Sequence, residues 1–291
     1  MNKEQIEKPR IASDWRLLYR PTRFGIYVND HSLIKANDGK WYLFGITGMT
    51  DEGRPQMERY FTYGCTDRLF ETPMTELGKV IDEGMCAWAP AVIEHKGLYY
   101  MYYGPNTTRM AVTHDPSHWM GHPIQLNGVP PMAVHRDHMV IPYENGWLMY
   151  ASGVKDGYGC VSLLYSDDLI HWDFRGYALT SSGDAPLTPP WGAFESPFVL
   201  KHKDLYYMFV TYTDSGLETY HDTLVFCSED PCFFGDYTAS KHKEMVVAEL
   251  PVHAGEVVCE NGQYYITTCG WNGYHVPCEG GVAIAKLNFE V

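Results

Sequence analysis

The chain has 291 residues, of which 45% are hydrophobic and 20% charged, a composition typical of a globular protein that can bury a large core. Its formal charge of −14 at pH 7 argues against a nucleic-acid partner, because such binding depends on Lys and Arg that neutralise phosphates. No apolar run is long enough to span a membrane. We therefore expect neither nucleic acid nor a membrane among its partners.

The first twenty residues, from Met1 to Arg20, mix basic and acidic side chains and contain no apolar segment. This is not the pattern of a secretory signal, so we expect a cytoplasmic protein. Eight cysteines are present without a CxxC pair, which favours free thiols over disulfides or zinc. The sequence indicates no cofactor and leaves the oligomeric state open.

One pattern recurs along the chain: a short apolar strand, a charged turn with Gly or Asp, and an aromatic-rich strand. The copies read HSLIKANDGKWYLFGIT from His31, APAVIEHKGLYYMYYG from Ala89, DHMVIPYENGWLMYAS from Asp137, ESPFVLKHKDLYYMFVTY from Glu195 and GEVVCENGQYYITTCG from Gly255. Their turns hold residues that tolerate positive φ, as tight antiparallel connections require. Each copy therefore predicts a β-hairpin.

A further β-rich run that ends on an acidic turn follows most of the hairpins. These runs are GCTDRLF, MAVTHDPSHW, LLYSDDLIHW and LVFCSEDPCF. Each predicts a third strand beside its hairpin.

Corresponding positions in the repeats, near residues 30, 88, 137, 195 and 253, are 49 to 58 residues apart. A propeller blade of four strands takes about 40 to 50 residues, so these steps leave room for loops. A single sheet of this kind has open edges and uncovered faces, and radial repetition removes both problems. We expect an all-β, five-bladed β-propeller formed by one domain, residues 1–291. A β-sandwich, the alternative, does not require five copies of one signature.

In a propeller the innermost strand of each blade lines the central channel, so we expect function where these strands begin. Three of the five starts carry carboxylates: Asp30, Asp137 and Glu195. Glycoside hydrolysis needs one carboxylic acid to protonate the leaving oxygen and one carboxylate to attack or to activate water. A third carboxylate can raise the pKa of the acid. These three residues therefore predict a glycosidase that acts on an oligosaccharide.

Neighbouring side chains are expected to hold sugar hydroxyls or to stack on the ring. They are Asn29, His31, Trp88, Arg136, His138, Trp191 and His253. The tryptophans could instead pack between blades, and Arg136 could form an ion pair that lowers the pKa of Asp137. His253 alone does not indicate a metal, because calcium prefers oxygen ligands, and we predict no metal site.

The motifs resemble those of the five-bladed propeller glycosidases, families 43 and 32 of the glycoside hydrolases. WAPAV followed by GLYYMYYG, and SDDLIHWDFRG from Ser166 to Gly176, are typical of family 43. VNDHS, HRDHM and FESPF are similar to the NDP, RDP and EC motifs of the family 32 fructosidases. The resemblance covers the chain from Phe24 to Lys286.

The resemblance implies that Asp30 is the general base of an inverting family 43 enzyme or the nucleophile of a retaining family 32 enzyme. It makes Glu195 the general acid, and Asp137 the residue that tunes this acid or holds the sugar. His31 and His138 stand where the fructosidase motifs have Pro, and Ser196 stands where they have Cys. The chain also leaves no room for the C-terminal β-sandwich usual in family 32.

These departures favour an arabinofuranosidase or xylosidase of the family 43 type, with inversion of configuration. A retaining β-fructofuranosidase is the first alternative, and a non-catalytic carbohydrate-binding propeller is the second. A glycoside phosphorylase is the third, since its phosphate would need cationic side chains. The candidates for that role are Arg23, Arg54, Arg109 and Arg136.

Overall fold

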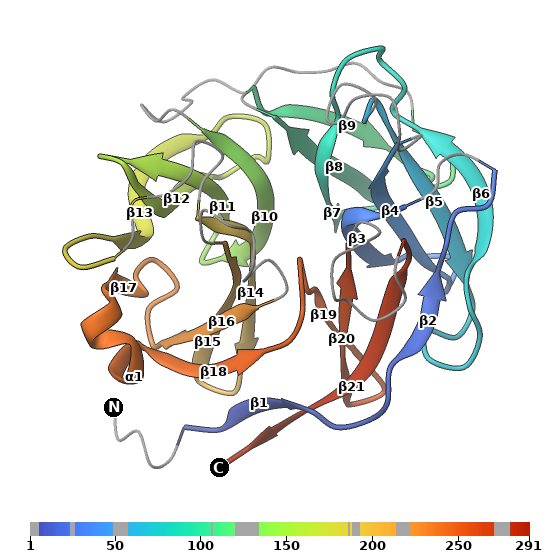
Figure 1. Cartoon of the computed structure of the whole chain (residues 1–291). Helices are drawn as coiled ribbons and strands as arrows, with labels where there is room; N and C mark the ends of the chain where they lie inside the picture. The colour runs from blue at the N-terminus through green and yellow to red at the C-terminus, as the bar shows by residue number, and fades with distance from the viewer. Residues whose placement is uncertain are drawn as a thin grey trace.

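The structure, a computed structural model, describes residues 6–23, 27–48, 58–105, 107–119, 134–185, 187, 193–213, 222–270 and 280–291. Five sheets stand around a common axis as the blades of a β-propeller (Figure 1). This confirms the fold class expected from the sequence. Within these ranges the helical segments are η2 (Ala239–Lys241) and α1 (His242–Met245), and neither has the length or apolarity needed to cross a membrane.

Each blade begins at the axis and continues outward. Blade 1 contains β3 (Asn29–Lys35), β4 (Trp41–Thr47), β5 (Tyr60–Thr66) and β6 (Thr75–Val80). Blade 2 contains β7 (Trp88–His95), β8 (Leu98–Gly104) and β9 (Arg109–Thr113). Blade 3 contains β10 (His135–Tyr143), β11 (Gly146–Lys155), β12 (Tyr158–Ser166), β13 (Asp173–Ser181) and β17 (Gly235–Tyr237). Blade 4 contains β14 (Phe194–His202), β15 (Leu205–Tyr212), β16 (Thr223–Ser228) and β18 (Val246–Leu250).

The turns between the two innermost strands of each blade have the backbone conformation that the sequence predicts. Lys96, Glu144, Lys203 and Asn261 take φ values from 51 to 54° in blades 2 to 5. In blade 1 the positive φ falls on Gly39, at 86°. These tight turns make each inner pair an antiparallel hairpin.

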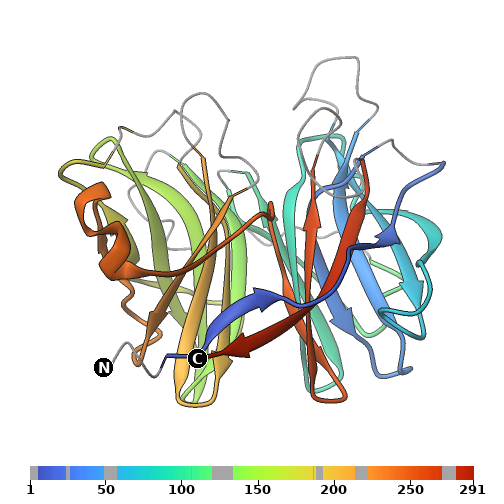
Figure 2. The ribbon, with the colours of Figure 1, turned by 60° about the horizontal axis from the view of Figure 1, so that its bottom comes forward.

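Blade 5 is completed by strands from both ends of the chain. Its hairpin is β19 (Val257–Glu260) and β20 (Gln263–Cys269), followed by β21 (Val282–Glu290). The first strands of the chain, β1 (Lys8–Ile11) and β2 (Arg16–Tyr19), both pair antiparallel with β21. Figure 2 shows β1 beside the C-terminal end of β21. Strand pairing between the two ends therefore closes the ring.

Apolar side chains hold neighbouring blades together. Among the described residues there are five buried apolar clusters, one at each interface between adjacent blades. Strand β8 shows the reason, because side chains alternate between the two faces of a strand. Tyr99, Met101 and Tyr103 pack toward blade 1, whereas Tyr100 and Tyr102 pack toward blade 3. The aromatic-rich strands thus supply the core on both of their faces.

Strand β2 provides a test of the ring closure, because Leu18 is fully buried between blades 5 and 1. We expect Leu18→Ala to lower the free energy of unfolding by about 2 to 5 kcal/mol, the usual cost of removing a buried leucine side chain. Leu17→Ala is the matched control, because the side chain of Leu17, next to Leu18 in the chain, is 36% exposed. This substitution should change the free energy of unfolding by no more than about 0.5 kcal/mol. Denaturant unfolding measures both, and equal losses would contradict the assigned packing of β2.

Candidate active site

The inner strands share one irregularity near their start. In blades 1 to 4 the register with the second strand shifts there, which accommodates an extra residue as a β-bulge. One residue of each bulge has a left-handed backbone, with φ from 46 to 58° when the equivalent residue of blade 5 is included. These residues are Asp30, Ala89, Asp137, Ser196 and Ala254. The five blades therefore present one equivalent residue each to the channel.

The bulge changes the alignment of the strand starts inferred from the sequence. Asp30 and Asp137 occupy the left-handed position, whereas Trp88, Glu195 and His253 precede that position by one residue. The three carboxylates thus come from two adjacent positions of the repeat. The repeats themselves contain this offset, because each left-handed residue lies three positions before the first of two apolar residues of its repeat, as Asp30 does before Leu33 and Ser196 before Val199.

His253 was expected to open the fifth inner strand, but β19 begins at Val257. The backbone of His253 still pairs with β20, since its carbonyl accepts a hydrogen bond from the Cys269 N–H at 3.2 Å. The Thr267 N–H donates to the carbonyl of Glu256 at 2.9 Å. The bulge at Ala254 lies between these two bonds and interrupts the ladder, which explains the later start of the strand.

Arg136 joins two of the predicted catalytic carboxylates. Its two terminal nitrogens donate to Asp137 Oδ2 and to Glu195 Oε1, each at 2.8 Å. All three side chains are buried, with at most 8% of each exposed. The ion pair with Asp137 considered from the sequence is therefore present, and it extends to Glu195.

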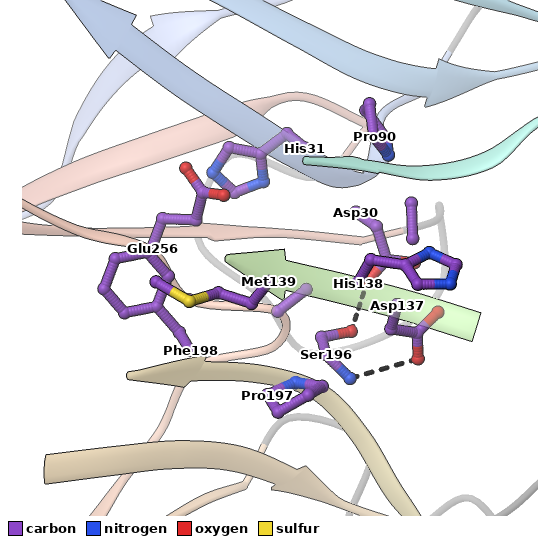
Figure 3. Close-up of a pocket in the computed structure, with 13 residues that line it drawn as sticks. Asp30, His31, Pro90, Asp137, His138, Met139, Ser196, Pro197, Phe198 and Glu256 are labelled. Carbon is purple, nitrogen blue, oxygen red and sulfur yellow. Dashed lines mark hydrogen bonds between the residues drawn. The ribbon is translucent and has the colours of Figure 1, made fainter. Parts of the chain in front are cut away.

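Ser196 joins the remaining carboxylate to this network. Its hydroxyl donates to Asp30 Oδ1, and its backbone N–H donates to Asp137 Oδ2 at 3.1 Å (Figure 3). Asp30, Asp137 and Glu195 are thus connected through Arg136 and Ser196 at the starts of the inner strands of blades 1, 3 and 4.

The surroundings of the carboxyl groups set their protonation. Burial raises the pKa of Glu195 to about 8, although Arg136 opposes the increase. Burial also raises the pKa values of Asp30 and Asp137, and these increases are opposed by the Ser196 hydroxyl and by Arg136 respectively. At neutral pH Glu195 therefore carries a proton that it can donate.

Four of the residues expected to hold the sugar have partners within the protein. The Nε2 atoms of His31 and His138 lie 2.7 Å from Thr267 Oγ1 and Thr108 Oγ1. Burial lowers the pKa of both histidines, that of His31 to about 3, so both rings are neutral. His253 Nε2 lies 2.9 Å from Asn29 Oδ1. These pairs orient the four side chains at the channel.

The two predicted tryptophan contacts differ in what the structure describes. Trp88 begins β7 and is partly exposed, and it packs against the apolar cluster between blades 1 and 2. Trp191 lies outside the described residues. Among the residues that are described, no group of three or more His, Cys, Asp and Glu side chains has the arrangement of a metal site.

A cavity of about 30 Å³ lies among the inner strands, and all five blades line it (Figure 3). Its lining includes the left-handed residue of every blade, among them Asp30, Asp137 and Ser196. This volume suits water molecules and not a sugar ring. The cavity therefore has room beside the carboxylates for water that can hydrate them.

Glu256 is a fourth carboxylate at this cavity, and it was not predicted from the sequence. Its Oε2 accepts a hydrogen bond from the Leu33 N–H at 2.7 Å, and burial raises its pKa to about 8. The equivalent positions of the other repeats hold Ser32, Ala91, Met139 and Phe198. A glutamate at a position that is apolar in three other repeats was the signal that could have revealed it.

No protein-family model matches the chain. In an alignment 232 residues long that covers 67% of this chain, the chain is 28% identical to an extracellular exo-α-(1→5)-L-arabinofuranosidase of Cellvibrio japonicus. The match spans 62% of that relative, which is less than two thirds of its length.

Solved structures of glycoside hydrolases share the fold. A β-xylosidase covers 91% of this chain and 94% of its own, with a TM-score of 0.63 and 17% identity. A family 43 enzyme from Xanthomonas citri, in complex with xylotriose, covers 91% and 87%, with a TM-score of 0.62 and 16% identity. A family 32 β-fructofuranosidase from Bombyx mori covers 98% and 63%, with a TM-score of 0.64 and 17% identity. The resemblance to families 43 and 32 expected from the sequence is confirmed.

The raised pKa of Glu256 predicts a pH-dependent stability. Between the ordinary pKa of 4.5 and the folded-state value of about 8, the folded protein holds a proton that the unfolded chain has lost. The free energy of unfolding therefore decreases as pH rises through this window. Gln cannot ionise, so Glu256→Gln does not lose this stability. We expect its free energy of unfolding, relative to that of the wild type, to increase by about 2 kcal/mol or more as the pH rises from 5 to 9.

Glu260→Gln is the control of opposite sign. Burial raises the pKa of Glu260, but hydrogen bonds from Trp41 and Lys35 outweigh it and hold the pKa below its usual range. The stability that this carboxylate contributes is present at neutral pH and is lost on acidification. Relative to the wild type, Glu260→Gln should be less stable at neutral pH, with the difference shrinking in acid. Denaturant unfolding from pH 4 to pH 9 measures both variants, and parallel curves for wild type and Glu256→Gln would refute the assignment.

Proposed function

We propose that this chain hydrolyses the glycosidic bond of an arabinofuranosyl or xylosyl oligosaccharide with inversion of configuration. Glu195 is the general acid, Asp30 is the general base, and Asp137 tunes the acid. The observation that carries the proposal is the network itself. It holds one buried carboxyl group whose pKa of about 8 keeps it protonated, connected through Arg136 and Ser196 to two further carboxylates.

In the proposed reaction Glu195 gives its proton to the glycosidic oxygen as the bond from that oxygen to the anomeric carbon breaks. Asp30 takes a proton from the water whose oxygen bonds to the same carbon. Glu195 becomes negative during this step, and the guanidinium of Arg136, already 2.8 Å from Oε1, stabilises the developing charge. The negative charge of Asp137 raises the pKa of Glu195 between turnovers.

The choice of a pentose rests on the relatives. The curated relative is an arabinofuranosidase, and the solved structures include a β-xylosidase and a family 43 enzyme that binds xylotriose. A panel of aryl α-L-arabinofuranoside, β-D-xyloside, galactofuranoside and fructoside separates the proposal from the fructosidase alternative. Turnover of the fructoside alone would favour the alternative.

Two of the four arginines considered for phosphate binding, Arg109 and Arg136, are already paired within the protein, which favours water as the acceptor. Arg109 forms an ion pair with Glu83 at 2.8 Å and donates to the carbonyl of Gly104 at 2.6 Å. Arg136 is bonded to Asp137 and Glu195, and the negative charge of Asp137 would repel a phosphate. Arg54 lies outside the described residues. A phosphorylase would need these cations for its phosphate.

Removal of either reacting group should reduce turnover strongly. We expect Asp30→Asn and Glu195→Gln each to lower kcat by at least about a hundredfold, the low end of what a positioned acid or base contributes. Asp137→Asn should instead move the basic limb of the kcat/KM profile to lower pH, because it removes a charge that raises the pKa of Glu195. Steady-state kinetics on the preferred aryl glycoside and on a natural oligosaccharide test this. Near-normal turnover of the oligosaccharide by either of the first two variants would remove its assigned role.

The stereochemistry of the product tests whether Asp30 activates water or attacks the sugar itself. Activation of water requires carboxyl groups about 6.5 to 9.5 Å apart, whereas direct attack requires about 5 to 5.5 Å. We expect inversion. Proton NMR of the sugar first released identifies its anomer, and retention would make Asp30 the nucleophile.

A further inference from the structure

Ser196 makes a contact that the proposed reaction has not used. It directly follows Glu195 in the chain, yet its hydroxyl donates to Oδ1 of Asp30, 166 residues away on another blade. Blades 1 and 4 are not neighbours in the ring (Figure 1), so this bond reaches across the channel. It connects the strand that carries the proposed acid to the side chain of the proposed base.

We propose that Ser196 is a positioning residue that holds the Asp30 carboxylate in the orientation needed to accept a proton from the attacking water. This inference rests on the proposed function and deepens it. The bond fixes Oδ1, and the proton of the water goes to Oδ2, the oxygen that Ser196 does not hold. A hydroxyl that donates to a carboxylate stabilises its charged form, which is the form that a base needs.

The backbone supports this role. Ser196 is the left-handed residue of its bulge, with φ 50°, and its N–H is fixed by Asp137 Oδ2 at 3.1 Å. The backbone that carries the Ser196 hydroxyl is therefore itself hydrogen-bonded to the carboxylate network. Asp30 is also the left-handed residue of its blade, with φ 49°. The bond thus joins two equivalent positions of the propeller, both of which line the cavity (Figure 3).

The repeats of this chain show how the hydroxyl can be removed without disturbing the backbone. The position equivalent to Ser196 holds Ala89 in blade 2 and Ala254 in blade 5, with φ 46° and 47°. Alanine is therefore accommodated twice in this left-handed conformation. Ser196→Ala removes the oxygen and leaves a residue that the same bulge already accepts.

We expect Ser196→Ala to lower kcat about tenfold with little change in KM, because the ground-state contacts with the sugar are kept. The acidic limb of the kcat/KM profile should move about one pH unit higher. The sign follows from the bond, since its loss destabilises the carboxylate form and raises the pKa of Asp30. Ser196→Gly should behave in the same way, because it also lacks the hydroxyl and relieves the positive φ.

Ser181→Ala is the matched control. Ser181 is a buried serine of β13 whose hydroxyl donates to a backbone carbonyl, that of Gly159, at 2.9 Å. We expect loss of the Ser181 hydroxyl to lower the free energy of unfolding and to leave the acidic limb of the kcat/KM profile unchanged. If Ser196→Ala leaves the acidic limb in place while it alters stability as Ser181→Ala does, Ser196 is structural and the inference is overturned.

A second measurement does not depend on turnover. Carbon-detected NMR of the carboxyl groups gives the pKa of Asp30 in wild type and in Ser196→Ala, with Asp30→Asn identifying the resonance. We expect the pKa of Asp30 to be about one pH unit higher in Ser196→Ala, and an unchanged value overturns the inference. Failure of the wild type to cleave any glycoside in the panel would be a different result. It would refute the proposed function, while the titration would still decide whether Ser196 controls the charge of Asp30.

Discussion

Both faces of every blade are apolar, and this constraint determines the rest of the structure. A sheet of this kind cannot expose either face to water, so each blade must be covered on two sides by others like it. The alternating side chains of β8, which pack toward blade 1 and toward blade 3, show how one strand meets this requirement. The solution is a closed ring, and a closed ring directs the starts of all inner strands toward one axis. Carboxylates that are far apart in the chain come together because the apolar faces leave no other arrangement.

The electrostatics of the candidate site follow from the burial that the ring imposes. Asp30, Asp137 and Glu195 share one guanidinium, that of Arg136. If all three acids were ionised, this network would hold two uncompensated negative charges in a place that solvates charge poorly. Protonation of Glu195 reduces the excess to one. The burial that makes the arrangement costly therefore also keeps Glu195 protonated, as an acid catalyst must be.

The sequence predicted those features that repeat and missed those that deviate from the repeat. Five aromatic hairpins with suitable turns were sufficient for the fold, because each copy reports the same strand and turn. The offset between Asp30 and Glu195 was missed, although alignment of the apolar residues Leu33 and Val199 makes Ser196, and not Glu195, equivalent to Asp30. Strands β1 and β2 were also missed, because RLLY and KPRI lack a hairpin partner close in the sequence and pair with β21 instead. Whether Trp191 contacts a sugar stays a prediction, since it lies outside the described residues.

The pairing of β1 and β2 with β21 has a consequence for the biosynthesis of the protein. Their partner β21 follows every other strand that the structure describes, so on the ribosome β1 and β2 stay unpaired until β21 has been translated. Until then the growing chain exposes an uncovered blade face and unpaired strand edges, the features that promote aggregation of nascent proteins. Chaperones that bind apolar segments would meet this chain during that interval, and pairing of β21 with β1 and β2 would end their access.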